Sequence, residues 1–216
     1  AKISGIGTNI LTIEGVDSLG GVGSIDVIPD RIEAGTFLIA VAATGGKVKL
    51  NNVEPKHMES VINLLRKSGI DIIEDKKSIT VTSNGLDIKA CNMETHEYPG
   101  FPTDLQAQWM LLMSLASGNS TIKENIYFDR FTHILELNRL GCDVHLEDGC
   151  ATIKGDRSLI GANVMSTDIR ASAALIIGAL CADGATNISR VYHIDRGYDK
   201  IEEKLAKVGA KITRKK

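Results

Sequence analysis

Three stretches of this 216-residue chain are typical of helices that are apolar on every side, and they constrain the fold more than any other feature. In residues 101–118, a proline and a threonine favour a helix start, and a closing glycine favours a stop. Only Ser114 interrupts the apolar run over residues 109–115. A surface helix keeps a polar stripe, so a helix without one belongs inside a fold. We therefore predict a buried helix whose first turn carries one carboxylate, that of Asp104.

The same design occurs twice more, at intervals of about 70 residues. Asp168 and Arg170 open an apolar run over residues 173–182, and residues 30–34 open another over residues 37–43. Repeats of this length usually pack together, because one unit cannot bury its own apolar face. The alternative is three separate small domains.

Strand and helix patterns between these helices complete each unit as strand, buried helix, strand, amphipathic helix and hairpin. We therefore expect an α/β (α+β) fold: an inside-out α/β barrel of three βαβαββ repeats, with the helices buried at the centre and the sheets outside. A single domain over residues 1–216 would hold repeats at about 22–94, 95–160 and 161–216, with residues 1–21 closing the ring.

Closure of the ring is predicted by a motif that recurs at a constant offset of 140 residues. In the second unit this motif lies on the closing strand, so its earlier copy is the closing strand of another unit. We therefore expect Ile10–Glu14 to pair with Lys211–Thr213. The matching residues are Thr12, Ile13, Gly15, Ser18, Leu19 and Gly21 with Thr152, Ile153, Gly155, Ser158, Leu159 and Gly161.

Composition narrows the classes of function. A formal net charge of −2 and 4% aromatic residues argue against a nucleic-acid surface. No apolar run approaches the roughly 20 residues of a membrane helix, and no basic leader precedes an apolar segment, so we expect a cytoplasmic protein without membrane contact. The four cysteines form no Cys-x-x-Cys pair, so we expect structural thiols with neither disulfide nor zinc: Cys91, Cys142, Cys150 and Cys181.

Charged residues at the helix starts are the candidates for chemistry. The helix dipole would keep Asp104 ionised, as a hydrogen-bond acceptor or a base, although it could also merely support the helix start. Arg130, Arg170 and Arg196 stand at corresponding ends of the repeated units, so we expect them to converge on one face as an anion site. The alternative for each arginine alone is a surface ion pair.

Four motifs closely resemble the UDP-N-acetylglucosamine 1-carboxyvinyltransferase family, the enolpyruvyl transferases of peptidoglycan synthesis. They are residues 30–36, 98–108, 167–172 and 192–198. The resemblance covers essentially the whole chain but only the C-terminal half of the family enzyme. It implies two similar domains in that enzyme, each with three βαβαββ units around central helices.

The resemblance also implies a reaction, with no metal or organic cofactor. The 3′-hydroxyl of UDP-N-acetylglucosamine adds to phosphoenolpyruvate, and phosphate then leaves. Asp104 would accept the hydroxyl proton, and Arg196 would hold the phosphoenolpyruvate end of the site. Arg170 and Arg130 would add positive charge around the phosphate and carboxylate.

Two further roles follow from the same resemblance. Asp168 would orient the arginine cluster, and Ile126 would touch the nucleotide sugar through its backbone. The missing N-terminal domain would supply a catalytic cysteine loop, so we expect this chain alone not to turn over. The alternatives are a non-catalytic binding or scaffold domain, and the sister 3-phosphoshikimate 1-carboxyvinyltransferase, in which we would not expect the string at residues 193–197.

Overall fold

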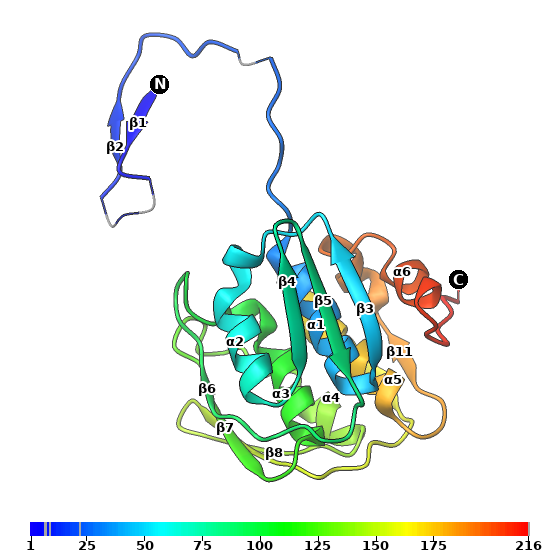
Figure 1. The fold of residues 1–216 in the computed structure, drawn as a ribbon. Coiled ribbons are helices and arrows are strands. Elements are labelled where there is room, and N and C mark those ends of the chain that lie inside the picture. The colour runs from blue at the N-terminus through cyan, green and yellow to red at the C-terminus, as the bar shows by residue number, and fades with distance from the viewer. Residues whose placement is uncertain (7, 9, 22, 216) are drawn as a thin grey trace.

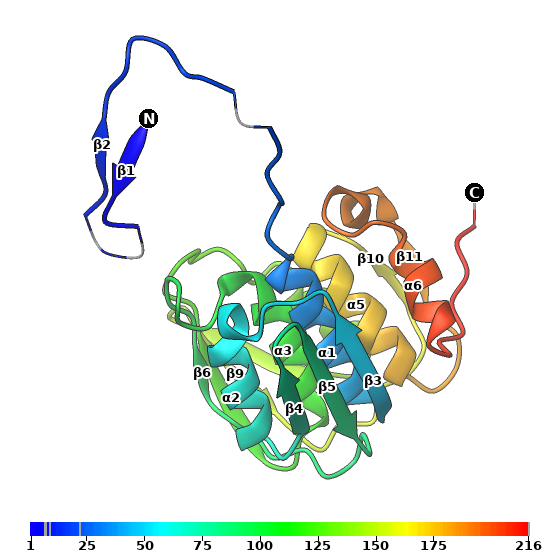
Figure 2. The same ribbon diagram turned by 45° about the horizontal axis from the view of Figure 1, so that its top comes forward.

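The computed structural model describes residues 1–6, 8, 10–21 and 23–215. The repeat bounds placed at residues 22 and 216 lie outside the described residues. Three helices pack against one another at the centre of the body (Figures 1 and 2): α1 (Arg31–Thr44), α3 (Gln106–Leu115) and α5 (Ile169–Cys181). One large side chain from each is wholly inaccessible to solvent: Leu38, Trp109 and Leu175. The three buried helices predicted from the sequence are therefore confirmed.

Three sheets lie around these helices, and each contains the strands of one unit (Figure 2). The first sheet has the order β3-β5-β4 and the second β6-β7-β9-β8, whereas the third contains only β10 and β11. The fold class expected from the sequence, with helices inside and sheets outside, is confirmed. The strands are β3 (Gly46–Asn51), β4 (Asp71–Asp75), β5 (Ser78–Ser83), β6 (Met93–Glu94), β7 (Asn119–Lys123), β8 (Asp143–Glu147), β9 (Cys150–Lys154), β10 (Asn163–Met165) and β11 (Asn187–Ser189).

Shorter helices complete the units. The 3-10 turn η1 (Pro55–Met58) leads into α2 (Glu59–Lys67), which buries one apolar face against α1 and β4. The second and third units contain α4 (Ile134–Arg139) and α6 (Ile201–Lys207). Two further 3-10 turns, η2 (Thr103–Leu105) and η3 (Val191–Arg196), are the ones that position the site. None of the helices in the described part of the chain has the length and apolar character needed to cross a bilayer.

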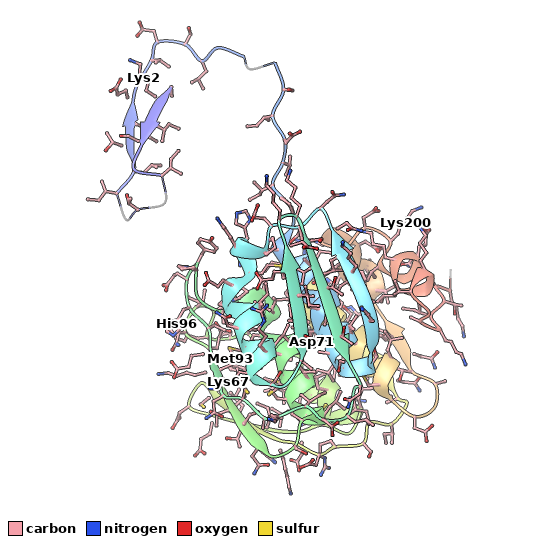
Figure 3. All side chains as sticks on the ribbon, viewed as in Figure 1. Lys2, Lys67, Asp71, Met93, His96 and Lys200 are labelled. Atoms are coloured by element: carbon pink, nitrogen blue, oxygen red, sulfur yellow. The ribbon has the colours of Figure 1, made fainter. Side chains whose placement is uncertain are left out.

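The described residues of the N-terminal segment 1–21 stand away from the body (Figures 1 and 3). In it β1 (Lys2–Ser4) pairs antiparallel with β2 (Thr12–Glu14). The expected pairing of residues 10–14 with 211–213 is therefore absent, and residues 211–213 form no strand. A local hairpin closes a short loop, whereas ring closure joins segments about 200 residues apart at a higher entropic cost.

A packing prediction follows from the turn after β9. A Cβ atom on Gly155 would come within 2.1 Å of the carbonyl oxygens of Ala116 and Gly118. Gly155→Ala should therefore lower the free energy of unfolding by about 1–3 kcal/mol in urea denaturation. Gly23→Ala is the matched control, because a Cβ there meets nothing within 4 Å. An equal loss of unfolding free energy in both variants would show that the close contacts at Gly155 do not cause the destabilisation.

Candidate active site

The candidate site is built on the N-terminal ends of two central helices. The turn η2 contains Asp104 and leads directly into α3, which begins two residues later at Gln106. The carboxylate predicted for the first turn of the helix therefore lies in the 3-10 turn just before it. Asp168 is the N-cap of α5, where its Oδ1 accepts hydrogen bonds from the backbone N–H groups of Arg170 (2.8 Å) and Ala171 (3.0 Å). This cap fixes the first turn of α5, and with it the point from which the Arg170 side chain projects.

Two arginines meet on one oxygen of Asp104. Arg130 Nη1 donates to Asp104 Oδ1 at 2.7 Å, and Arg170 Nε donates to the same atom at 3.2 Å. Within the described residues, no hydrogen bond reaches Asp104 Oδ2, so this second oxygen is an available acceptor. The Asp104 side chain is 34% exposed and each arginine side chain 20%, so the cluster lies in a partly dry position that solvent still reaches.

These contacts fix the charge state of Asp104. Burial raises the pKa of its carboxyl group, but the hydrogen bond from Arg130 and the charges of Arg170 and Arg130 together outweigh burial. The net result is a pKa below the ordinary value for aspartate, so the carboxylate is ionised at neutral pH. A carboxylate with a low pKa is a weak base. Asp104 can therefore take a proton from a hydroxyl group only when that group becomes more acidic during the reaction.

The Arg170 guanidinium packs against a buried polar network. Its guanidinium lies 5.8 Å from the ring centroid of Tyr198. Tyr198 Oη lies 2.8 Å from Thr36 Oγ1 on α1, and Gln108 Nε2 on α3 donates to Thr36 Oγ1 at 3.2 Å. Burial raises the pKa of Tyr198, so its hydroxyl keeps its proton. This network joins the polar ends of all three central helices at one place.

The loop after β7 is organised by Glu124, a carboxylate only 2% exposed. It accepts hydrogen bonds from Thr95 Oγ1 (2.6 Å) and Thr103 Oγ1 (2.9 Å), and from the backbone N–H groups of Ile126 (2.9 Å) and Tyr127 (3.0 Å). The Ile126 backbone is therefore held at the entrance to α3. The next residue, Tyr127, has the Arg130 guanidinium 5.3 Å from its ring centroid, which links this loop to the Asp104 cluster.

Arg196 lies close to the cluster through its backbone. It is exposed at the end of η3, and a Cβ on the next residue, Gly197, would be 3.5 Å from Arg170 Nη1. Among the described residues, no ion pair joins the Arg196 side chain to Asp104. The structure therefore brings Asp104, Arg130 and Arg170 into contact and leaves Arg196 at their margin.

Three of the four cysteines are held as protonated thiols. All four are free. Burial raises the pKa of Cys91, that of Cys142 to about 11 and that of Cys181 to about 12, so these thiols are protonated at neutral pH. The described residues contain no group of three or more His, Cys, Asp or Glu placed to hold a metal ion.

Comparison with known proteins identifies the family. The family described as EPSP synthase (3-phosphoshikimate 1-carboxyvinyltransferase) matches residues 1–205. The chain belongs to the EPSP synthase family. Within it, two relatives named UDP-N-acetylglucosamine 1-carboxyvinyltransferase come from Ruthia magnifica subsp. Calyptogena magnifica and Aliarcobacter butzleri (strain RM4018). They are 52% and 50% identical to this chain, over 99% and 100% of it. This confirms the resemblance seen in the sequence.

The relatives are longer than this chain, which covers 51% of each of these two. Two solved structures show the same fold. The enolpyruvyl transferase NikO from Streptomyces tendae matches with a TM-score of 0.80 at 25% identity, covering 88% of this chain and 45% of that one. EPSP synthase from Acinetobacter baumannii matches with a TM-score of 0.68 at 17% identity, which is a likeness of fold alone.

Removing an arginine from the cluster should change the titration of Asp104. Arg130→Met keeps a long side chain but deletes the 2.7 Å hydrogen bond and one positive charge. The pKa of Asp104 should therefore rise, which NMR titration of carboxyl-labelled aspartate measures directly. Arg139→Met is the control, because Arg139 pairs with Glu136 instead. An unchanged pKa for Asp104 in Arg130→Met would show that Arg130 does not hold this carboxylate in solution.

His133 should make the stability of the chain sensitive to acid. It is 1% exposed, and burial lowers its pKa from 6.5 to about 4, with Asp168 opposing and Arg130 reinforcing this shift. The unfolded chain binds this proton more readily, so stability is lost as pH falls from about 6.5 to about 4.

Urea denaturation between pH 4.5 and 7 tests this. His133→Leu should flatten the pH dependence of the unfolding free energy, whereas His145→Leu, at a side chain 81% exposed, should not. The same slope in His133→Leu as in the parent chain would assign the acid sensitivity to other groups.

Proposed function

We propose that this chain is the part of a UDP-N-acetylglucosamine 1-carboxyvinyltransferase that receives the nucleotide sugar and takes the proton from its 3′-hydroxyl. The observation that carries the proposal is the state of Asp104. One of its oxygens is held by two arginines, and no described residue donates to the other. The relatives that are 52% and 50% identical to this chain bear that enzyme's name, which supports this choice of substrate.

The arginines suit a substrate with two anionic groups. Asp104 neutralises one positive charge of the Arg130–Arg170 pair, so the three side chains together retain one, and Arg196 at the margin adds a second. Phosphoenolpyruvate carries a phosphate and a carboxylate, both of which match the planar donors of arginine. The N-terminal ends of α3 and α5 add further positive potential at the same place. Asp168 contributes by holding the first turn of α5.

Asp104 then has a defined task in the addition step. The sugar oxygen forms a bond to the central carbon of phosphoenolpyruvate, and its proton passes to Asp104 Oδ2. The electron pair of the double bond takes up a proton at the methylene carbon. Because the pKa of Asp104 is low, its proton uptake would accompany C–O bond formation, when the hydroxyl has become acidic. Loss of phosphate and of a methyl proton then restores the double bond.

The proton for the methylene carbon needs a source outside this set. Cys91 and Cys142 are buried and Cys181 is partly buried, all three thiols are protonated, and none belongs to the Asp104 cluster. The chain spans about half the length of its curated relatives, so the proposal includes a second domain that supplies the acid. By itself the chain would bind substrate without turnover. The proposal places the enzyme in the cytoplasm, where phosphoenolpyruvate is formed.

Complementation tests the proposal. The N-terminal half of a 50% identical relative, added in trans with both substrates, should restore phosphate release. Asp104→Asn should reduce this activity about 10²- to 10⁴-fold, the usual range for loss of an acid–base group. The control Asp148→Asn changes an aspartate in the exposed β8–β9 turn and should retain activity.

Each alternative predicts a different result. Phosphate release by this chain alone would refute its dependence on a second domain. Equal activity of Asp104→Asn and the parent chain would remove Asp104 as the base. Consumption of 3-phosphoshikimate in place of the nucleotide sugar would assign the sister activity. A chain that binds neither substrate nor the added half would support a scaffold role.

A further inference from the structure

The two oxygens of Glu124 bind different parts of the candidate site. Oε1 accepts hydrogen bonds from Thr95 Oγ1 at 2.6 Å and from the backbone N–H groups of Ile126 (2.9 Å) and Tyr127 (3.0 Å). Oε2 accepts a hydrogen bond from Thr103 Oγ1 at 2.9 Å. Because Thr103 is the first residue of η2, one carboxylate joins the loop after β7 to the turn that carries the proposed base.

The start of α3 is held differently from the starts of the other two central helices. α1 and α5 begin after aspartate N-caps, Asp30 and Asp168, whose side chains accept hydrogen bonds from backbone N–H groups. In the described part of the chain, neither η2 nor α3 has a side-chain hydrogen bond at its N-cap. The hydrogen bond from Thr103 to Glu124 therefore does for η2 and α3 what an N-cap does for α1 and α5.

The far end of the same loop is also fixed to the start of α3. Gln106 Nε2, from the first residue of α3, donates to the backbone carbonyl oxygen of Arg130 at 3.1 Å. The Arg130 side chain in turn donates to Asp104 Oδ1. Residues 124–130 are therefore attached at both ends to the η2–α3 junction, through Glu124 at one end and Arg130 at the other.

Burial keeps Glu124 out of direct contact with a substrate. Its exposed fraction is 2%, and that of Thr95 is 0%. A buried carboxylate is tolerated only when hydrogen bonds replace the lost water, and Glu124 has such bonds on both oxygens. Its place beside the start of α3 also favours a negative charge, because the helix dipole is positive there. Any effect of Glu124 on the reaction must therefore pass through the groups that it holds.

We propose that Glu124 is a positioning residue for proton transfer: through Thr103 it fixes η2, and with it the direction in which Asp104 Oδ2 faces the sugar hydroxyl. This inference rests on the proposed function, in which Asp104 takes that proton. The need for a second support follows from the arginines, which hold Asp104 by its other oxygen alone. A single point of attachment leaves a carboxylate free to turn, and a base displaced by about 1 Å loses about 10²-fold in rate.

The two oxygens of Glu124 should contribute to different kinetic constants. Loss of the Thr103 hydroxyl leaves the three hydrogen bonds to Oε1 in place, so the loop at residues 124–130 keeps its shape. Binding of the nucleotide sugar should then be nearly unchanged, whereas proton transfer to Asp104 should slow. Replacing Glu124 itself would leave four donors without an acceptor, so the test changes Thr103 instead.

Thr103→Val removes the hydroxyl and keeps nearly the same shape. With the N-terminal half of a relative added in trans, kcat for phosphate release should fall at least about tenfold, and KM for UDP-N-acetylglucosamine should change less than about twofold. Thr103→Ser restores the donor and should recover activity to within about threefold of the parent. Thr121→Val is the matched control, because the Thr121 side chain makes no hydrogen bond to another described residue.

Hydrogen exchange of the chain alone tests the contact without any activity. The amides of Leu105 and Gln106 close η2 on the carbonyl oxygens of Pro102 and Thr103. Thr103→Val should speed the exchange of these two amides and leave the amides of residues 126 and 127 protected. Unchanged exchange at Leu105 and Gln106 would show that Glu124 does not fix η2, and would overturn the inference.

The kinetic outcomes separate this inference from the proposed function. A parent chain that releases no phosphate with the added half overturns the proposed function, and the positioning role with it. An active parent whose Thr103→Val variant keeps the parental kcat overturns the positioning role alone. The same holds if Thr103→Ser is as slow as Thr103→Val, or if Thr121→Val is equally slow, because the loss would then not follow the hydroxyl that contacts Glu124.

Discussion

The structure depends on the burial of three helices that have almost no polar side. α1, α3 and α5 pack on one another, and sheets and amphipathic helices surround them. The backbone groups inside such a helix bond to one another and its sides face apolar neighbours, so only its ends present free polar groups. Polar chemistry is therefore confined to the helix ends. The Tyr198–Thr36–Gln108 network joins α1 to α3, and Arg170 of α5 lies against the Tyr198 ring, so the N-terminal parts of all three helices meet at one of these ends.

The same confinement explains why a low-pKa carboxylate is useful here. Asp104 would be costly at the mouth of a buried helix without partners, since burial alone raises its pKa. Arg130 and Arg170 remove that cost, but they occupy the same oxygen. The result is an anion that stays charged and still has one acceptor atom to offer. A single arginine in bidentate contact would also keep the charge, but it would occupy both oxygens.

Local sequence signals were sufficient for the scaffold of this site. The apolar runs predicted the three buried helices, and the residues that open them included Asp104 at the start of α3 and Asp168 at the start of α5. These predictions succeeded because a helix start and an all-apolar helix depend on neighbours within a few residues. The sequence also predicted that Arg130, Arg170 and Arg196 converge on one face. The structure brings Arg130 and Arg170 into contact with Asp104 and leaves Arg196 at their margin.

The supporting residues could not be found in this way, because their roles depend on partners far along the chain. The structural role of Glu124 depends on hydrogen bonds from Thr95 and Thr103, which lie more than 20 residues earlier in the chain and cannot be paired with it from the sequence. Tyr198 lies within a motif noticed in the sequence, yet its hydroxyl is satisfied by Thr36, 162 residues away.

The predicted closing strand, residues 10–14, shows that a local sequence pattern does not determine the partner of a strand. Ile13 and Ile153 share one local pattern, and a pattern of period two predicts which residues would face a core but not whether a core is present. Ile153 lies between β7 and β8 and is fully buried, whereas Ile13 has only β1 beside it and is 58% exposed. The same strand motif is therefore buried or exposed according to which strands lie beside it, and the motif alone does not determine those neighbours.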